Sequence, residues 1–508
     1  MRGGGHFSAF DVAKYSKTAV NFEKGDGIMN PISADVTASM SVMDAIMKVN
    51  DVVNRFVWGA PVLILLVGTG IYLTVLLGLP QIRYFVAAMK EVFTSARGAN
   101  EADKSISSFA AMATAMAATV GTGNIAGVST ALHLGGPGAL VWMLISAFFG
   151  MCTKFAEVTL AVHFRQKDAH GDWRGGTMYI LEHGAGQKWL AVIFAIFAFL
   201  ASFGIGAATQ SNSAAEGLSM GFGVNHLYSG IAIAALVGLV IVGGLKSLSM
   251  VTTYLVPIMA VFYIITSIVV LVMNAAHIPE AIATVFKLAF ENPGETVPGA
   301  LAGWCVKEAV QKGIARGVFS NEAGMGSAPM VHATANVEHP VQQGFYGIFE
   351  VFVDTIVICT MTSLVIMTTG TLTGHPELTG SQLTLQAFEN ALGMGVGRYV
   401  LSVALLLFAF TTILGWYWYA ETAVTYLFGV WFKPVMKVLW IAMILLGASG
   451  AQLFGSAGNV FLNQIWDISD TLNGLMALPN LVGLLILSLT LRRVVKDYDA
   501  KKKRGEVK

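Results

Sequence analysis

Two short stretches of this chain place glycine and polar side chains inside apolar surroundings. Residues 120–127 read Val-Gly-Thr-Gly-Asn-Ile-Ala-Gly, and residues 316–329 contain Phe-Ser-Asn-Glu-Ala-Gly at their centre. Glycine in a helix interior costs about 1 kcal/mol relative to alanine, and polar side chains are costly in lipid. These stretches therefore favour interrupted membrane helices, in which free N–H groups bind an anion and free carbonyls bind a cation.

Close helix packing through small residues is the alternative interpretation of such glycines. The two stretches lie in the second and seventh predicted spans, five spans apart, so their helices run in opposite directions across the membrane. Opposed copies of one feature are typical of inverted repeats. The polar residues Asn124, Ser320, Asn321 and Glu322 add to this, and we expect two interrupted helices.

The composition sets the class of protein that must position these stretches. Only 12% of the 508 residues are charged and 55% are hydrophobic, and the mean hydropathy is +0.66. Soluble domains carry about 25% charge, so a soluble multidomain enzyme, a disordered chain and a nucleic-acid binder are excluded. The three cysteines are scattered, without metal-ligand spacing. An all-α polytopic membrane protein remains.

Runs of about 20 apolar residues, the length that crosses a bilayer, recur along the chain. We predict eleven spanning helices: 56–82, two within 105–153, then 189–215, 217–245, 247–279, 301–335, 355–376, 399–420, 438–466 and 471–491. Residues 277–298 are expected to form an external loop with a short surface helix.

The distribution of basic residues predicts the orientation. With the N-terminus outside, the inner segments carry nineteen lysines and arginines, while the outer segments after residue 56 carry only Lys287 and Arg398. Basic residues favour the cytoplasmic side, so residues 496–508 are expected to be a basic cytoplasmic tail. Six basic residues before residue 56 count against this orientation.

Residues 1–50 are expected to be an N-terminal extension to which no role is assigned. The first 28 residues lack the apolar core of a signal peptide. Met29, Met40 and Met43 are alternative start positions.

The chain resembles the alanine/glycine:cation symporter family of bacterial sodium-coupled transporters from about residue 50 to 490. The motifs that carry the resemblance lie at residues 118–127, 135–138, 154–157, 175–179 and 317–324. The family is similar in fold to the bacterial leucine transporter, which has two inverted five-helix repeats with broken first and sixth helices. The resemblance implies a transporter domain at 51–495, with an extra helix at 56–78, repeat one at 105–275 and repeat two at 300–491.

The resemblance implies sodium-coupled secondary active uptake of alanine or glycine by alternating access, in a bacterial inner membrane, with Na⁺ as coupling ion and no other cofactor. The sequence does not distinguish alanine from glycine as the preferred substrate, or the L from the D enantiomer. It also leaves open the coupling stoichiometry, the oligomeric state, and whether protons are coupled instead of Na⁺ through Glu322 or Asp354. An intramembrane enzyme would need a nucleophile–base pair or an HExxH-type metal motif, and a channel a repeated filter loop. Neither signal is present in the sequence.

The resemblance implies that N–H groups of the first break bind the substrate carboxylate. The second break lines the opposite side of the site, where its carbonyls and Asn321 accept hydrogen bonds from the substrate ammonium. A glutamine late in an apolar helix and a tryptophan in an aromatic cluster are expected to complete the pocket; the alternatives are an interhelical hydrogen bond and an interfacial belt. The predicted substrate residues are Thr122, Gly123, Gln210, Phe319, Ser320, Asn321, Met325 and Trp416.

Sodium prefers oxygen ligands, and the resemblance implies a site made of carbonyls from the first broken helix and a threonine pair from the eighth core helix. The alternative is that the threonines bond their own helix carbonyls. The predicted ligands are Ala117, Val120, Phe408, Thr411 and Thr412, with a second ion site at Thr119, Asn124 and Ser320.

Charged residues at membrane depth should face protein or water. Lys154 and Glu157, three apart on one helix, can pair. Glu308, Lys312 and Arg316 are expected to line the outer vestibule, whereas Glu322 and Asp354 are expected to stabilise the unwound segment or the ion path.

Overall fold

A computed structural model describes residues 31–95, 106–168, 171–292 and 304–507. The chain divides after Lys48 into two units. The described part of the first unit is the beginning of helix α1 (Pro31–Val57). The predictions for residues 1–28, for Arg97 and Lys104 and for residues 293–298 lie outside the described residues.

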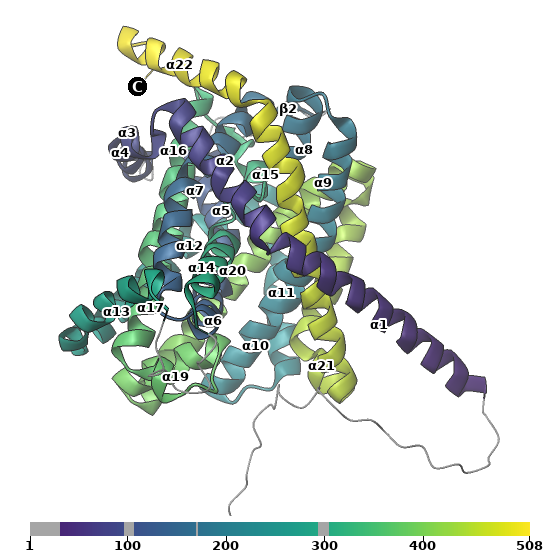
Figure 1. Ribbon diagram of the computed structural model, residues 1–508. Helices are drawn as coiled ribbons and strands as arrows, with labels where there is room; N and C mark the ends of the chain where they lie inside the picture. Colours follow the sequence, from purple (N-terminus) through teal and green to yellow (C-terminus); the bar gives the residue numbers. More distant parts are fainter. Residues whose placement is uncertain (1–30, 96–105, 169–170, 293–303, 508) are drawn as a thin grey trace, which may run out of the picture. The chain divides into compact units, whose positions relative to one another are not determined.

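The second unit, from Val49 on, is built mainly of helices (Figure 1). Its first part contains α2 (Ala60–Leu77), α3 (Pro80–Arg83), α4 (Phe85–Ser95), α5 (Ser108–Thr119), the 3-10 helix η1 (Thr122–Asn124), α6 (Ala126–Gly135), α7 (Ala139–His163), α8 (Thr177–Tyr179), the π-helix η2 (Ile180–Gly184), α9 (Lys188–Ala201), the π-helix η3 (Ser202–Ala208), α10 (Thr209–Phe222), α11 (His226–Val242), α12 (Gly244–Met273), η4 (Ala275–His277) and α13 (Ile278–Phe290).

The second part begins with the other interrupted stretch. It contains α14 (Val306–Asn321), α15 (Pro329–His332), α16 (Pro340–Val351), the π-helix η6 (Phe352–Cys359), α17 (Thr360–Thr368), α18 (Thr371–Gly374), α19 (Gly380–Leu392), α20 (Met394–Phe428), η7 (Val430–Phe432), α21 (Lys433–Ile486) and α22 (Ser488–Arg504).

Two short strand pairs complete the described structure. Strand β1 (Ile106–Ser107) pairs in parallel with β4 (Ala335–Asn336), and β2 (Gln166–Lys167) pairs antiparallel with β3 (Trp173–Arg174). Because β1 precedes α5 and β4 follows α15, the first pair joins the segments that flank the two interrupted stretches.

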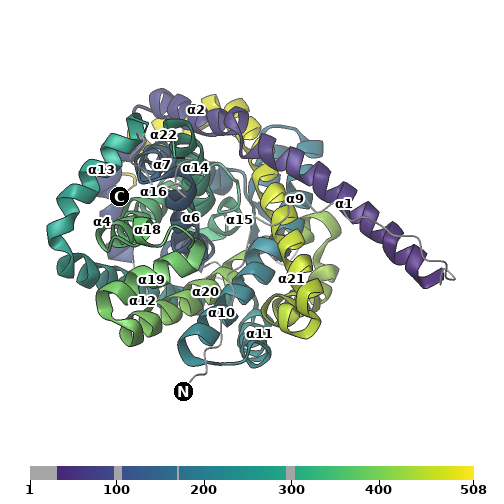
Figure 2. The same cartoon turned by 60° about the horizontal axis from the view of Figure 1, so that its bottom comes forward.

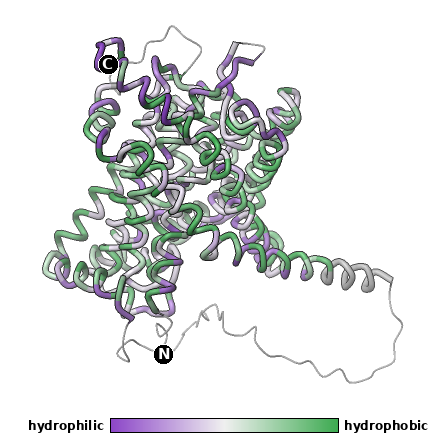
Figure 3. Tube along the Cα trace, turned by 45° about the horizontal axis from the view of Figure 1, so that its top comes forward, coloured by the Kyte–Doolittle hydropathy of each residue, from purple (hydrophilic) through white to green (hydrophobic). Residues whose placement is uncertain are grey.

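Within the described residues, seven helices are long and apolar enough to cross a membrane, and α5 and α11 are shorter apolar helices. Hydrophobic residues follow the middle of the helices, while hydrophilic residues gather toward the ends (Figure 3). The membrane location follows from these helices. The number of eleven spans and their inverted repeat stay predictions, because interrupted and polar helices such as α14 lack a continuous apolar run long enough to be recognised as a span by length and composition.

One predicted boundary is wrong. The sequence placed a turn between the spans 438–466 and 471–491, but α21 is helical there and bends at Gly455, whose φ of 57° and ψ of −133° are not helical. Glycine, without a Cβ, adopts positive φ readily. The residues after Gly455, namely Ser456, Gly458 and Asn459, are typical of a turn, but the long apolar run around them gave the prediction of one continuous span.

The helices that carry the interrupted stretches lie inside the second unit. Helix α5 packs against α12 and α20, and α6 packs against α14 and α19. Seen from the end that carries α19, α6 is surrounded by other helices (Figure 2). Helix α22 lies at the opposite end of the unit (Figure 1).

Candidate functional site

The first interruption separates α5 from α6. Helix α5 ends at Thr119, and Val120 and Gly121 are extended before the 3-10 turn η1. Asn124 closes this turn, because its Oδ1 accepts from the Gly121 N–H at 2.8 Å and its N–H donates to the Gly121 carbonyl at 3.1 Å. The N–H groups of Thr122 and Gly123 open the new helical segment, where amides have no acceptor within the helix. The predicted break is present.

The second interruption follows α14. Glu322 adopts the left-handed conformation, with φ 55°, which costs a non-glycine residue about 1–2 kcal/mol. Gly324 and Gly326 also have positive φ, and α15 begins at Pro329. The carboxamide oxygen of Asn321 accepts from the Ala323 N–H at 2.9 Å. The second predicted break is therefore also present.

A small cavity of about 20 Å³ lies between the two breaks. Its volume suits a single water molecule. Thr122 donates to Oε1 of Gln210 at 3.0 Å, and Gln210 donates to the Ile205 carbonyl of η3 at 3.1 Å. The cavity is lined by Ala118, Thr119, Gly121, Thr122, Gly123, Ile205, Gln210, Phe319, Glu322, Thr412, Trp416 and Asn473.

A larger open cavity of about 510 Å³, the vestibule, meets the small one at Thr122, Gly123 and Phe319. The centroid of the Phe319 ring lies 6.3 Å from the centroid of the Trp58 ring and 6.1 Å from that of the Trp466 ring. The Arg316 guanidinium lies 5.4 Å from the centroid of the Phe319 ring. The vestibule is lined by Thr122, Gly123, Ala126, Gly127, Thr130, Ala208, Thr209, Asn212, Ser213, Glu216, Arg316, Phe319, Gly380, Ser381, Leu462, Asn463 and Trp466.

The charged residues predicted for the vestibule are placed unequally. Arg316 lines it. Lys312 lines a smaller neighbouring cavity together with Arg316 and Phe319. Glu308 lines neither of these two cavities.

The structure brings Thr412, one of the two threonines of α20 predicted to bind sodium, to the first break, whereas the Thr411 hydroxyl faces the sulfur of Met259 at 3.1 Å. A methyl group added at Gly121 would lie 2.4 Å from the Thr412 hydroxyl oxygen. Thr412 donates to the Phe408 carbonyl at 2.8 Å, and Thr411 donates to the Leu407 carbonyl at 3.0 Å. Each hydroxyl thus bonds its own helix but keeps oxygen lone pairs for a cation. Ala117, Val120 and Phe408 are buried and belong to one hydrophobic cluster.

Two of the three residues predicted for the second ion site lie together with an aspartate. Asn124 donates to Ser320 Oγ at 2.9 Å and to Asp354 Oδ1 at 2.7 Å, and Ser320 donates to Asp354 Oδ2 at 2.9 Å. The hydroxyl of Thr119, the third predicted residue, instead faces the Ala115 carbonyl at 3.4 Å. Asp354 is an isolated acid in an apolar segment, and this was the sequence signal for it.

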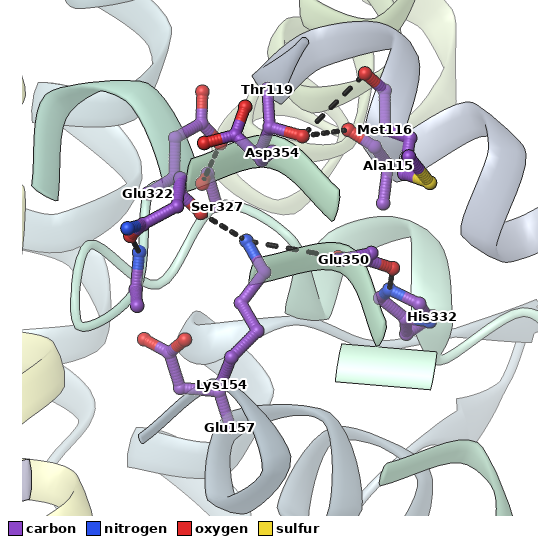
Figure 4. A network of polar contacts seen from close by, with 12 residues as sticks. Ala115, Met116, Thr119, Lys154, Glu157, Glu322, Ser327, His332, Glu350 and Asp354 are labelled. Carbon is purple, nitrogen blue, oxygen red and sulfur yellow. Dashed lines mark hydrogen bonds and ion pairs between the residues drawn. The ribbon is translucent and has the colours of Figure 1, made fainter. Parts of the chain in front are cut away.

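A buried polar network holds the second break (Figure 4). The Lys154 ammonium donates to the Asn321 carbonyl at 3.0 Å and lies 3.9 Å from Glu350. Glu350 in turn lies 2.6 Å from the imidazole of His332. The predicted pairing of Lys154 with Glu157 is wrong, since Glu157 accepts from the Gly326 N–H at 3.0 Å instead. The reason is that the unwound segment offers each side chain a backbone partner.

Three predicted substrate residues do not line the small cavity. Ser320 faces Asp354, and the Asn321 carboxamide donates to the Thr355 hydroxyl at 3.0 Å. Met325 is buried among apolar side chains of α2, α7 and α16. Two cavity residues were missed as such: Glu322 and Asn473. A polar residue in an apolar span was the available signal for Asn473.

Comparison with known proteins shows the family of the chain. The sodium:alanine symporter family matches residues 43–508. The sodium/alanine symporter AgcS of Methanococcus maripaludis is 44% identical over 88% of this chain and 95% of its own. The probable sodium/glutamine symporter GlnT of Bacillus subtilis is 36% identical, over 90% and 91% of the two chains.

A solved structure shows the fold. The transporter MhsT, crystallised with L-phenylalanine, superposes with a TM-score of 0.50 at 18% identity, over 78% of this chain and 97% of its own. This likeness supports the predicted fold of the leucine transporter type. The chain therefore belongs to the sodium:alanine symporter family, a family of membrane transporters and not of enzymes.

Proposed function

We propose that this protein carries alanine and glycine inward across a bacterial plasma membrane together with Na⁺, by alternating access. The observation that carries the proposal is the small cavity between two interrupted helices, reached through the vestibule at Thr122 and Gly123. The free N–H groups there suit a carboxylate. The side chains of Phe319 and Trp416 leave little space, which favours small substrates, and Phe319 must move for alanine to enter.

The coupling ion is assigned to the contact between the first break and α20. The carbonyls of Ala117, Val120 and Phe408 and the hydroxyls of Thr411 and Thr412 would supply oxygen ligands. Because Val120 and Thr122 belong to one unwound segment, ion and substrate should each strengthen the binding of the other.

The vestibule is assigned to the outer side. Its lining helices α6, α10 and α19 end away from the basic helix α22 (Figure 1). Because basic residues favour the cytoplasm, we assign the C-terminus to the inside and the N-terminus to the outside.

A proton-coupled carrier of the same fold is the second candidate, favoured by Asp354 in the Asn124–Ser320 cluster. Uptake of labelled alanine into proteoliposomes separates the two. We expect saturable uptake driven by an inward Na⁺ gradient, lost when K⁺ or choline replaces Na⁺, and inhibited by glycine. Uptake driven by a pH gradient without Na⁺ would instead support the second candidate.

A further inference from the structure

Among the residues that line the small cavity, one carries a formal charge: Glu322. Its side chain is 3% exposed. The other polar lining residues are neutral threonines, Gln210 and Asn473. A single buried carboxylate in a cavity requires a cationic partner or a proton, because an uncompensated buried charge is costly.

None of the described side chains forms an ion pair with Glu322. Within residues the structure describes, no lysine, arginine or histidine nitrogen lies within ion-pair distance of Glu322. Lys154, a nearby ammonium, is engaged by the Asn321 carbonyl at 3.0 Å and by Glu350 at 3.9 Å. The Ser327 hydroxyl donates to Oε2 of Glu322, which fixes the carboxylate but brings no positive charge to it.

The backbone gives Glu322 its direction. It is one of two non-glycine residues with positive φ in the described chain, and it directly follows the last residue of α14. A strained conformation of this kind marks functional positions when the surrounding structure maintains it. Here it places Glu322 among the residues of the same cavity that Thr122 and Gly123 line from the other break.

Asn321, which the sequence predicted to accept from the ammonium, is occupied. The Asn321 carboxamide donates to Thr355 and accepts from Ala323, and its backbone carbonyl accepts from Lys154. Asn321 does not line the cavity, whereas Glu322 does.

We propose that Glu322 binds the α-ammonium group of the transported amino acid and thereby selects α-amino acids over α-hydroxy acids. The inference rests on the proposed function and names the second half of its substrate site. The substrate carboxylate faces Thr122 and Gly123, the ammonium faces Glu322, and the side chain faces Phe319 and Trp416. L-lactate has the shape of alanine with a hydroxyl in place of the ammonium, so it would place a neutral hydroxyl at Glu322 and leave the charge of that carboxylate uncompensated.

The test is equilibrium binding of labelled L-alanine to the purified full-length protein in saturating Na⁺, with L-lactate as competitor. The wild type should bind alanine at least about 100-fold more tightly than lactate. Glu322→Gln should weaken alanine binding about 30-fold or more, the usual consequence of losing one partner of a buried charge pair. Lactate binding should not weaken, so the alanine-to-lactate ratio collapses.

Glu157→Gln is the matched control. Glu157 is also a buried carboxylate that bonds the second break, but it does not line the cavity, so this variant should keep the wild-type ratio. If Glu322→Gln does not fold, Glu322→Asp keeps the charge on a shorter side chain and should give an intermediate ratio.

A folded Glu322→Gln protein with the wild-type ratio would overturn the inference. A shift in the Na⁺ titration midpoint at unchanged ratio would do the same, because it would assign Glu322 to the ion. A wild-type protein that binds no alanine would overturn the proposed function, and this inference with it.

Discussion

At the scale of single residues, the Thr412 hydroxyl is assigned two interactions, a hydrogen bond within its own helix and a contact with the coupling ion. It donates to the Phe408 carbonyl, and it lies against Gly121 of the first break. A donated proton does not use the oxygen's lone pairs, so the helix bond and an ion ligand are compatible. The same side-chain orientation that forms the hydrogen bond within α20 also directs the Thr412 oxygen toward the first break, where the ion site is proposed.

Thr412→Ala should therefore weaken the Na⁺ dependence of alanine uptake. We expect the Na⁺ concentration for half-maximal uptake to rise about tenfold, the effect of losing about 1.5 kcal/mol from one interaction with a charged group. The control is Thr422→Ala, a buried threonine of the same helix that does not line the cavity. An unchanged sodium requirement in Thr412→Ala would show that the ion assignment is wrong.

Trp416 bounds the cavity from α20. A methyl group at Gly206 would lie 2.3 Å from its Cβ, so η3 fixes the position of this ring. Trp416→Phe should admit larger substrates, and inhibition of alanine uptake by L-leucine should improve about tenfold, since pockets discriminate by roughly 10–200-fold per methylene. Trp440→Phe, a buried tryptophan outside the cavity lining, should leave leucine inhibition weak. If both variants behave alike, Trp416 does not set substrate size.

The sequence identifies residue types at the breaks better than side-chain directions. Thr122, Gly123 and Gln210 meet as expected, because glycine and polar residues are costly inside apolar helices unless they form a break or a binding site. Met325 faces away, since its direction depends on positive φ at Gly324 and Gly326, which spacing does not reveal. Asp354 joins Asn124 across 230 residues, and such a pairing exists only in the fold.

At the scale of elements, both breaks depend on close approach to a neighbouring helix. Gly121→Ala would place a methyl group 2.4 Å from the Thr412 oxygen. Overpacking of this kind costs about 1–3 kcal/mol, so α20 must move off the break, and alanine uptake should fall at least tenfold with Na⁺ affinity reduced. Gly68→Ala on α2, where no atom lies within 4 Å, is the control in the same uptake assay. Normal uptake by Gly121→Ala would disprove the contact.

The hydropathy pattern locates most elements but not their ends. Long apolar runs correspond to α7, α12 and α20, because burial in lipid requires apolar length. The turn at Gly455 escaped prediction because it lies inside the long apolar run 438–466, although Ser456, Gly458 and Asn459 beside it are residues typical of turns. The π-helices η3 and η6 were also unforeseen, since they depend on what packs beside them.

At the scale of the whole protein, access is asymmetric. On one side the vestibule reaches Thr122 and Phe319. Polar contacts join segments around the second break: Lys154 with Asn321, Glu350 with His332, and β1 with β4. In the proposed orientation and the proposed cycle of alternating access, these contacts would open when the vestibule closes, and the structure would correspond to an outward-open state.

This asymmetry predicts a change of accessibility with substrate. In a Cys305→Ser background, where Cys152 and Cys359 are buried, Ser381→Cys lies in the vestibule and should react with a membrane-impermeant thiol reagent added outside intact cells. Na⁺ and alanine together should slow this reaction about tenfold, as a population shift away from the open state requires. Alanine added with choline in place of Na⁺ should leave the reaction rate unchanged. Met394→Cys, at an exposed position (73% exposed) at the start of α20, should react at one rate throughout. If Ser381→Cys reacts only with reagent on the cytoplasmic side, the assigned orientation is wrong. If its reaction rate is the same with and without substrate, the vestibule is not part of the transport path.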